Sequence, residues 1–254
     1  MRGYRAFLGK ELKEQIRNYK LLILIILFSI VGLLSPLTAK FLPRIMENLV
    51  DENMTILIAD PIYIDSWIQF FSNTNQISLV AILLIFSPIL AREYEKGTLV
   101  HMVTKGLSRR VIVLTKATVL YVSWTIGYWL SLLITLAYTH FYFPDSTTQG
   151  LLLASLALYS FGLLLLTILM TGAVLFKNTF APLLTVGVFV ILSFLADLIP
   201  ALHEWNPLQL ATRNIELLVL KETDQLLIQA FGVNFALIIL LLVLSIVIFN
   251  KKEL

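Results

Sequence analysis

The chain has 254 residues, of which 58% are hydrophobic and 14% charged, with a formal net charge of +3 and a mean hydropathy of +0.87. A soluble globular domain usually carries about 25% charged residues, so this composition excludes an ordinary water-soluble protein. The chain has no cysteine, which also excludes disulfides and thiolate metal sites.

Residues 1–20 combine basic side chains with apolar ones at helical spacing. The apolar positions are Tyr4, Phe7, Leu8, Leu12, Ile16 and Tyr19. Basic residues such as Arg5, Lys13 and Arg17 fall on other faces. This period predicts an amphipathic elbow helix on the inner leaflet, with its basic side attracted to anionic lipid. The alternative is a plain extension of the first membrane span.

Six long runs of the sequence are free of charged residues. They are residues 21–39, 66–91, 117–144, 146–176, 178–196 and 225–250. Each reaches the roughly 18–20 residues that an α-helix needs to cross a bilayer. The runs are continuously apolar rather than alternating, which favours helices over a barrel. The sequence therefore predicts an all-α membrane protein, residues 1–254 forming one domain with six transmembrane helices.

Basic residues are concentrated in the segments on one side of these runs. Fifteen of the 19 Lys and Arg residues lie there. The positive-inside rule then predicts that both termini are cytoplasmic, in the plasma membrane of a prokaryote. The opposite side is predicted to hold an acidic loop, a tight turn near Asp145 and a loop over 197–224. The acidic loop lies between the first and second runs, and its acidic residues are Glu47, Asp51, Glu52, Asp60 and Asp65.

A charged segment at 92–107 separates the second and third runs. Tyr94, Leu99 and Met102 fall on one side of a predicted helix of roughly 20 Å. Acidic residues at its start suit the helix dipole, and Gly106 predicts its end. Three readings follow: a docking element for a cytoplasmic partner, another interfacial helix, or charges that merely solvate a turn.

Small or weakly polar residues recur every four positions in the third run. They are Ser123, Gly127, Ser131, Thr135 and Thr139. Such a stripe allows close approach of helices, so it either packs within the chain or lines a substrate path. Trp124 and Tyr128 flank the stripe, and the alternatives for these rings are contact with lipid, contact with an amphipathic cargo along the path, or packing within the chain.

The segment 197–218 is apolar but interrupted by Pro200 and Pro207. It is too broken to span the membrane. Asp197 lies at a membrane edge between apolar stretches, so it either takes part in gating or simply marks the boundary.

Several motifs around the charged segment resemble those of a known family. They are Glu93-x-Glu95-x-Gly97-Thr98-Leu99, then Thr104-Lys105-Gly106-x-Ser108-Arg109-Arg110 with Lys116, and the stretch 65–71 before helix 2. These residues, together with the topology, resemble the permease subunits of ABC (ATP-binding cassette) transporters of the type-2 export family. Gly106 departs from the Pro that many members have there. Among such permeases, exporters of amphipathic, phenol-soluble-modulin-like peptides fit best.

The resemblance implies that 92–107 is a coupling helix, which docks on a separate ATPase subunit. Its contact residues would be Glu93, Tyr94, Glu95, Gly97, Thr98, Leu99 and Met102. Arg109 and Arg110 would anchor it at the lipid headgroups. It also implies short re-entrant helices at 197–218 that form an outer lid.

The sequence has no phosphate-binding loop of the G-x-x-x-x-G-K-[ST] type, so we expect the chain not to be an enzyme. ATP and Mg²⁺ would be bound by two copies of a partner ATPase, and a second permease copy would complete a homodimer. We expect membrane lipid as a further partner, no nucleic acid, and neither cofactor nor metal in this chain. The cargo would be a hydrophobic or amphipathic peptide, toxin or lipid-like compound. The alternatives are an ion-coupled secondary transporter and a non-transporting immunity or sensor protein.

Overall fold

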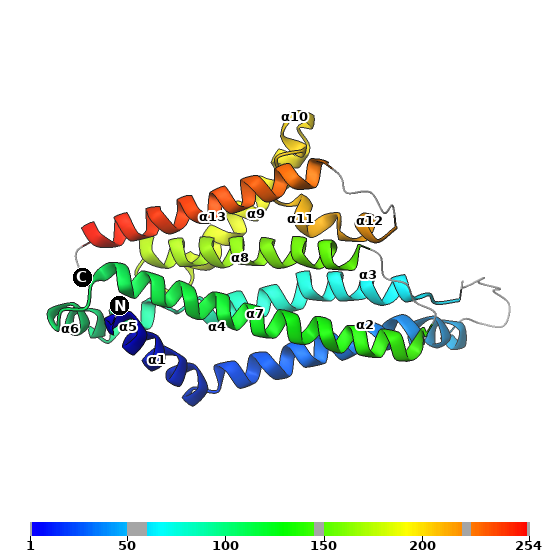
Figure 1. Cartoon of the computed structure of the whole chain (residues 1–254), viewed down its shortest axis with the longest axis horizontal. Helices are drawn as coiled ribbons and strands as arrows, with labels where there is room; N and C mark the ends of the chain where they lie inside the picture. Colours follow the sequence, from blue (N-terminus) through cyan, green and yellow to red (C-terminus); the bar gives the residue numbers. More distant parts are fainter. Residues whose placement is uncertain (1, 50–59, 145–149, 220–224, 253–254) are drawn as a thin grey trace.

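The computed structural model describes residues 2–49, 60–144, 150–219 and 225–252, and these residues form helices and connecting turns without a strand. The predicted acidic residues Asp51 and Glu52 and the turn at Asp145 lie outside the described residues. Figure 1 shows long helices lying side by side along one axis, with short helices at both ends. The all-α prediction is therefore confirmed.

Within the described residues, five helical stretches are long and apolar enough to cross a membrane. They are α2 (Lys20–Leu49), the stretch α3 (Tyr63–Asn73), η1 (Thr74–Ser78), α4 (Leu79–Phe86) and α5 (Ala91–Glu95), then α7 (Arg109–Tyr142), α8 (Leu151–Leu175) and α13 (Gln225–Lys251). The remaining predicted span corresponds to α9 (Ala181–Asp197), which has 17 residues. At about 1.5 Å per residue it covers roughly 26 Å, less than a hydrocarbon core of about 30 Å. The structure thus supports five of the six predicted spans by length.

The stripe of small residues on α7 packs within the chain against α2. A side chain at Gly127 would overlap the ring of Phe28, and one at Gly32 would overlap the backbone of Ser131. The Thr135 hydroxyl donates a hydrogen bond to the Gly32 carbonyl over 3.0 Å. The backbones of the two helices therefore approach closely, as such stripes permit. Of the two predicted roles, packing is the one that this geometry supports.

Trp124 and Tyr128 do not face lipid, and packing within the chain is the predicted alternative that their burial supports. Both are fully buried, in an aromatic cluster with Phe28 of α2 and Phe70 of α3. Their polar atoms are paired with α8: the Trp124 indole N–H donates to the carbonyl of Tyr159 over 3.0 Å, and the Tyr128 hydroxyl donates to that of Ser155 over 2.7 Å. Because the pairing satisfies their polar groups, these side chains fill the protein core.

The N-terminal helix α1 (Arg2–Arg17) packs against α7. Phe7 is buried, and the Tyr4 hydroxyl lies 2.8 Å from that of Thr118. The predicted apolar face therefore covers this chain's own core over most of its length. Only its end, at Ile16 and Tyr19, is exposed.

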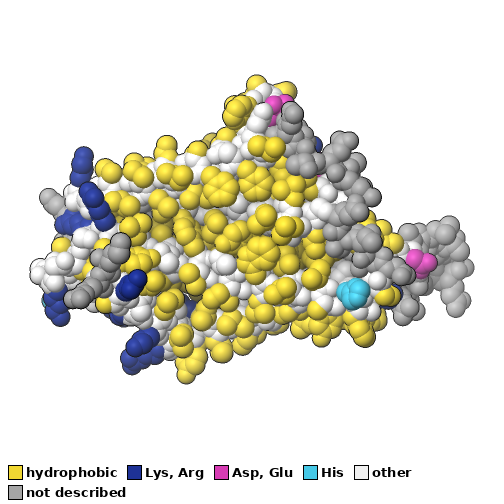
Figure 2. Space-filling view, viewed as in Figure 1, with side chains coloured by type: hydrophobic (Ala, Val, Ile, Leu, Met, Phe, Trp, Pro, Cys, Tyr) yellow, Lys and Arg dark blue, Asp and Glu magenta, His cyan; other side chains and the backbone are white. Residues whose placement is uncertain are grey.

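Charge separates the two ends of the molecule. Lys and Arg side chains gather at the end where α1 begins and α13 ends, as Figures 1 and 2 show together. We call this the basic end. The visible Asp and Glu side chains lie on the upper projection and near the opposite end, where a His is also visible, and the intervening surface is largely hydrophobic. This pattern is that of a protein whose middle lies in a membrane.

Candidate functional site

The charged segment at the basic end is built from two short helices rather than the single predicted one. α5 ends at Glu95, and α6 covers Thr98–Thr104. Gly97 lies between them with a φ of 62°, and Gly106 ends the segment with a φ of 89°. Residues with side chains rarely adopt such left-handed angles, so the two glycines fix where the chain turns. The sequence predicted the turn at Gly106 but not the one at Gly97.

One side of α5 and α6 is turned into the molecule. Leu99 and Glu93 are buried, and Tyr94 and Met102 pack against the core. The Thr98 hydroxyl donates to the Glu93 carbonyl over 3.3 Å, joining the two short helices. The predicted contact residues on this side therefore hold the segment against its own chain.

The other side of the segment is exposed and mixed in chemistry. It carries Glu95, Lys96, Val100, His101, Thr104 and Lys105. We call these six residues the outward face. Of the coupling residues that the family resemblance implies, only Glu95 belongs to it. Sequence periodicity located the segment and its apolar side, but it did not identify the other exposed positions.

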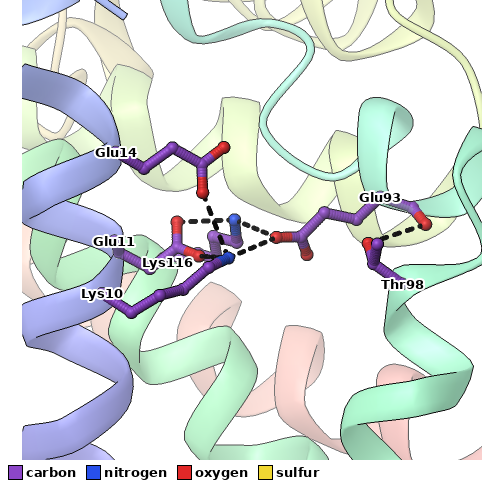
Figure 3. A network of polar contacts seen from close by, with 6 residues as sticks. All are labelled: Lys10, Glu11, Glu14, Glu93, Thr98 and Lys116. Atoms are coloured by element: carbon purple, nitrogen blue, oxygen red, sulfur yellow. Dashed lines mark hydrogen bonds and ion pairs between the residues drawn. The ribbon is translucent and has the colours of Figure 1, made fainter. Parts of the chain in front are cut away.

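Behind the outward face lies a buried cluster of charges, drawn in Figure 3. The Lys116 ammonium of α7 lies 2.7 Å from a carboxylate oxygen of Glu11 and 2.7 Å from one of Glu93. Lys10 adds contacts of 2.9 Å to Glu11 and 3.1 Å to Glu14. Three elements, α1, α5 and α7, thus meet through alternating charges. The sequence singled out Glu93 and Lys116 but did not predict that they pair with α1.

Lys10 and Glu14 form the more exposed part of this cluster, and each stabilises the charge of the other. Burial would lower the pKa of Lys10, but its hydrogen bonds to Glu11 and Glu14 and their negative charge outweigh this and raise it. Burial would likewise raise the pKa of Glu14, but Lys10 lowers it. Each partner therefore holds the other in its charged form.

Arg109 binds the end of another helix rather than serving as the predicted headgroup anchor. Its guanidinium donates to the carbonyls of Phe249 and Asn250 over 3.2 and 3.0 Å, and also to that of Lys252. These carbonyls are the unpaired acceptors at the C-terminal end of α13, where positive charge is favourable. Arg110 is exposed, as an anchor would be.

Replacing Arg109 by glutamine should therefore loosen the last turn of α13. Loss of these charge-assisted bonds is expected to lower the free energy of unfolding by about 1–2 kcal/mol. Thermal unfolding of the purified full chain in detergent measures this. The matched change Arg110→Gln should alter the free energy of unfolding by no more than about 0.5 kcal/mol. If the two variants lost equal stability, Arg109 would not be stabilising the end of α13.

The C-terminus makes a second connection at this end. The Lys252 ammonium donates to the carbonyls of Val174 and Leu175 over 2.6 and 2.9 Å, at the end of α8. It also lies 5.2 Å from the ring centroid of Tyr94. The segment 92–107 is thus in contact, directly or through one residue, with α1, α7, α8 and α13.

A lateral apolar groove lies between the second span and α9. Its volume is about 690 Å³. The walls come from η1, α4, α8, α9 and α11 (Gln209–Thr212), and include Leu83, Phe161, Val186 and Phe194. Two amides, Asn75 and Gln76, are its polar lining from η1. A concave, mostly apolar site with few polar groups is the usual form of a ligand site.

A π-helix sets the position of these amides. η1 interrupts the second span, and the Leu79 N–H bonds back to the Thr74 carbonyl five residues earlier. π-turns of this kind occur frequently at functional sites. The Asn75 amide also donates to the Ala211 carbonyl of α11 over 3.1 Å. Sequence reasoning missed this region, although the polar run 73–76 within an apolar stretch was a usable signal.

The segment 197–218 contains short helices, as predicted: α10 (Pro200–His203), α11 and the start of α12 (Asn214–Val219). α11 and α12 pack on α8, whereas α10 projects from the upper side of the bundle, beside the start of α13, in Figure 1. Pro200 is the first residue of α10, and Pro207 is buried ahead of α11.

The Asp197 carboxylate contacts several polar side chains of this segment. Its carboxylate lies 3.1 Å from the Asn206 amide and 3.1 Å from His203, and it also accepts from Gln209. Asn206 in turn donates to the Ser193 carbonyl over 2.7 Å. Asp197 therefore connects α10 and α11 to the end of α9. This structural role goes beyond marking the membrane boundary, the simpler of its two predicted roles.

Comparison with known proteins identifies one relative of the same length. The chain is similar to the uncharacterized transmembrane protein YxlG of Bacillus subtilis (strain 168), with 24% identity over 262 aligned residues that cover 100% of this chain and 99% of the relative. No protein-family model and no solved structure matches the chain. Together with the five spanning-length helices, the likeness leads to a coarse assignment: the chain is a transmembrane protein with several membrane-spanning helices.

Proposed function

We propose that this chain is the membrane subunit of an ATP-driven exporter of the ABC type-2 kind. Two copies would form the translocation path, and two copies of a separate ATPase would drive it from the basic end. That end would face the cytoplasm of a prokaryotic cell, with both termini there and with α9 as the sixth span across the plasma membrane. Charge asymmetry supports this orientation.

The observation that carries the proposal is the outward face and what lies behind it. A connecting loop needs no exposed face of mixed apolar and charged residues, braced by a buried ion cluster. The outward face offers Val100 for burial and Glu95 and Lys105 for pairing with a partner, which suits a polar and transient interface.

The same contacts would transmit movement from the ATPase to the spans. A partner that pulls α5 and α6 would move Glu93, and through Lys116 it would move α7 and α1. The contacts of Tyr94 and Lys252 would pass the displacement to α8. Shifting a two-state path from 1:99 to 99:1 needs about 5.5 kcal/mol of differential binding, so a firm connection is required.

The lateral groove supports an amphipathic cargo. Its wall is apolar, and its amides donate and accept hydrogen bonds without carrying charge. The described groove lining holds no ionisable side chain. A peptide, toxin or lipid-like molecule with a long apolar part would bind here, whereas a small ion would find no counter-charge.

Copurification tests the docking role of the outward face. The full chain would be co-expressed with an ABC ATPase from the same organism, chosen first from neighbouring genes with Walker motifs. The ATPase retained on the tagged chain would be measured together with its ATP turnover. Glu95→Lys with Val100→Asp is expected to reduce retention by about tenfold or more, because a buried apolar contact and a charge pair are both lost.

The matched control is a pair of changes on the opposite end, Glu204→Lys with Leu202→Asp, which has the same chemistry on the exposed α10 region. It should leave retention unchanged. If the outward-face variant assembles normally, and if the chain moves cargo on a proton or sodium gradient without ATP, then a secondary transporter replaces this proposal.

A further inference from the structure

A second concave site lies at the basic end, on the side of α1 that faces away from the core. Its volume is about 750 Å³. One wall is formed by α1 from Arg5 to Arg17 and by Asn18, which follows it, and the other by Lys96, between α5 and α6. We call this the α1 groove.

The α1 groove is strongly basic. Its lining holds Arg5, Lys10, Lys13, Arg17 and Lys96 against a single acidic residue, Glu14. Lys10 is engaged with carboxylates of the ion cluster. The other four basic side chains have no carboxylate partner within the described part of the chain. Their charge is therefore available to an anionic ligand.

The floor of the α1 groove is open to a bulky group. Ala6 and Gly9 lie there, and a Cβ at Gly9 would meet nothing within 4 Å. α1 is about 24 Å long at 1.5 Å per residue, and the basic residues follow it from Arg5 to Arg17. A phosphate can thus approach the helix closely while cations surround it.

Apolar side chains adjoin the same groove. Ile16 is 61% exposed and Tyr19 66%, at the junction between α1 and the first membrane span. Leu22 and Ile23 continue this exposed apolar surface along α2. A ligand with a phosphate at one end and long hydrocarbon at the other satisfies both parts, whereas free phosphate or an acidic peptide satisfies only the first.

We propose that the α1 groove binds the headgroup of an anionic phospholipid whose acyl chains lie along the start of α2. The bound phosphate would bridge the basic residues of α1 and Lys96. Since Lys96 belongs to the outward face, the lipid would hold α1 and this segment together. The lipid site requires no ATPase, so it stands or falls separately from the exporter proposal.

Lipid titration of the full chain in an uncharged detergent tests the proposal. Native mass spectrometry would count bound dioleoylphosphatidylglycerol, with dioleoylphosphatidylcholine as the neutral comparison. We expect the anionic lipid to bind about tenfold tighter or more. The variant Arg5→Glu/Lys13→Glu/Arg17→Glu should lose at least about tenfold in affinity, because each basic residue near an anionic headgroup contributes about a fivefold factor.

The matched control changes net charge equally at the same end but outside the groove: Lys105→Glu/Lys177→Glu/Lys251→Glu, all exposed positions. Its affinity should stay within about twofold of the original. A further variant, Gly9→Leu, fills the floor while favouring helix formation, and should weaken binding about threefold or more without loss of folding.

Three results would overturn the proposal. Equal losses in the two charge variants would mean diffuse attraction rather than a site. Normal lipid binding by Gly9→Leu would exclude the groove. Competition by inorganic phosphate or glycerol phosphate at the same concentration as the lipid would identify a free phosphate anion as the ligand, and the acyl chains would then have no part.

Discussion

Replacing Lys116 by methionine is expected to lower the free energy of unfolding by about 3–5 kcal/mol, the usual cost of removing one partner from a buried ion pair. Lys116 is only 4% exposed, and it pairs with both Glu11 and Glu93. Without it, two buried carboxylates would share only the half-exposed Lys10. Thermal or denaturant unfolding of the purified chain measures the change, and loss of contact between α1 and α7 should accompany it.

Lys10→Met provides the matched control. The same side chain is removed, but the Lys10 side chain is 50% exposed, so its ion pairs are screened and the loss should be within about 1 kcal/mol. The triple change Glu11→Gln/Glu93→Gln/Lys116→Met should recover much of the stability, because no buried charge is then left uncompensated. If the two lysine variants lost equal stability, the buried pairs of Lys116 would not be the main stabilising contacts of the cluster.

Gly162→Ala is expected to destabilise the chain by about 1–3 kcal/mol, because there is no room for one more carbon in this part of the core. A Cβ at Gly162 would lie 2.5 Å from Cε2 and 2.8 Å from Nε1 of Trp124. The indole is fully buried, and the backbone of α8 holds it through Tyr159. To relieve the overlap, the ring must shift, and its contacts with Phe28 and Tyr128 must change.

Gly232→Ala on α13 is the control for this substitution. A Cβ there would meet nothing within 4 Å, and alanine is the better helix former by about 1 kcal/mol. Its stability should be unchanged or higher. The position of the tryptophan emission maximum gives an independent reading, since displacement of Trp124 should alter it only in the Gly162 variant.

The spans could be predicted from sequence because hydrocarbon imposes a simple rule. A helix that satisfies its own backbone needs about 20 apolar residues, and uncharged runs of that length are visible by inspection. α9 shows the limit of the rule. The uncharged run 178–196 is long enough, but the helix begins only at Ala181, because the chain must first turn away from α8.

The position of the candidate site could be predicted from the sequence, but which of its charged side chains are buried could not. Periodicity placed Leu99 and Met102 on one face correctly. It could not reveal that Glu93 is buried, since the cations that make this tolerable, Lys10 and Lys116, are 83 residues before and 23 residues after it. Charge pattern alone treats an isolated Glu as exposed, and only tertiary packing shows otherwise.

For a related reason, the sequence did not decide between lipid contact and core packing for the aromatic residues of α7. In a membrane protein, a lipid-facing ring and a core ring have the same hydrophobicity, so composition does not distinguish them. What distinguishes Trp124 is the missing side chain opposite it at Gly162, and what distinguishes Tyr128 is the Ser155 carbonyl. Both signals lie on another helix.

The wide turn of η1 also affects how this protein should be compared with its relatives. An α-helix rotates about 100° per residue, and a π-turn accommodates one surplus residue without rotating the halves on either side out of register. A relative that lacks one residue between Thr74 and Ser78 can therefore keep Trp67 and Leu79 in their present environments. An alignment of this span should accordingly place its gap within η1 and not in the flanking turns.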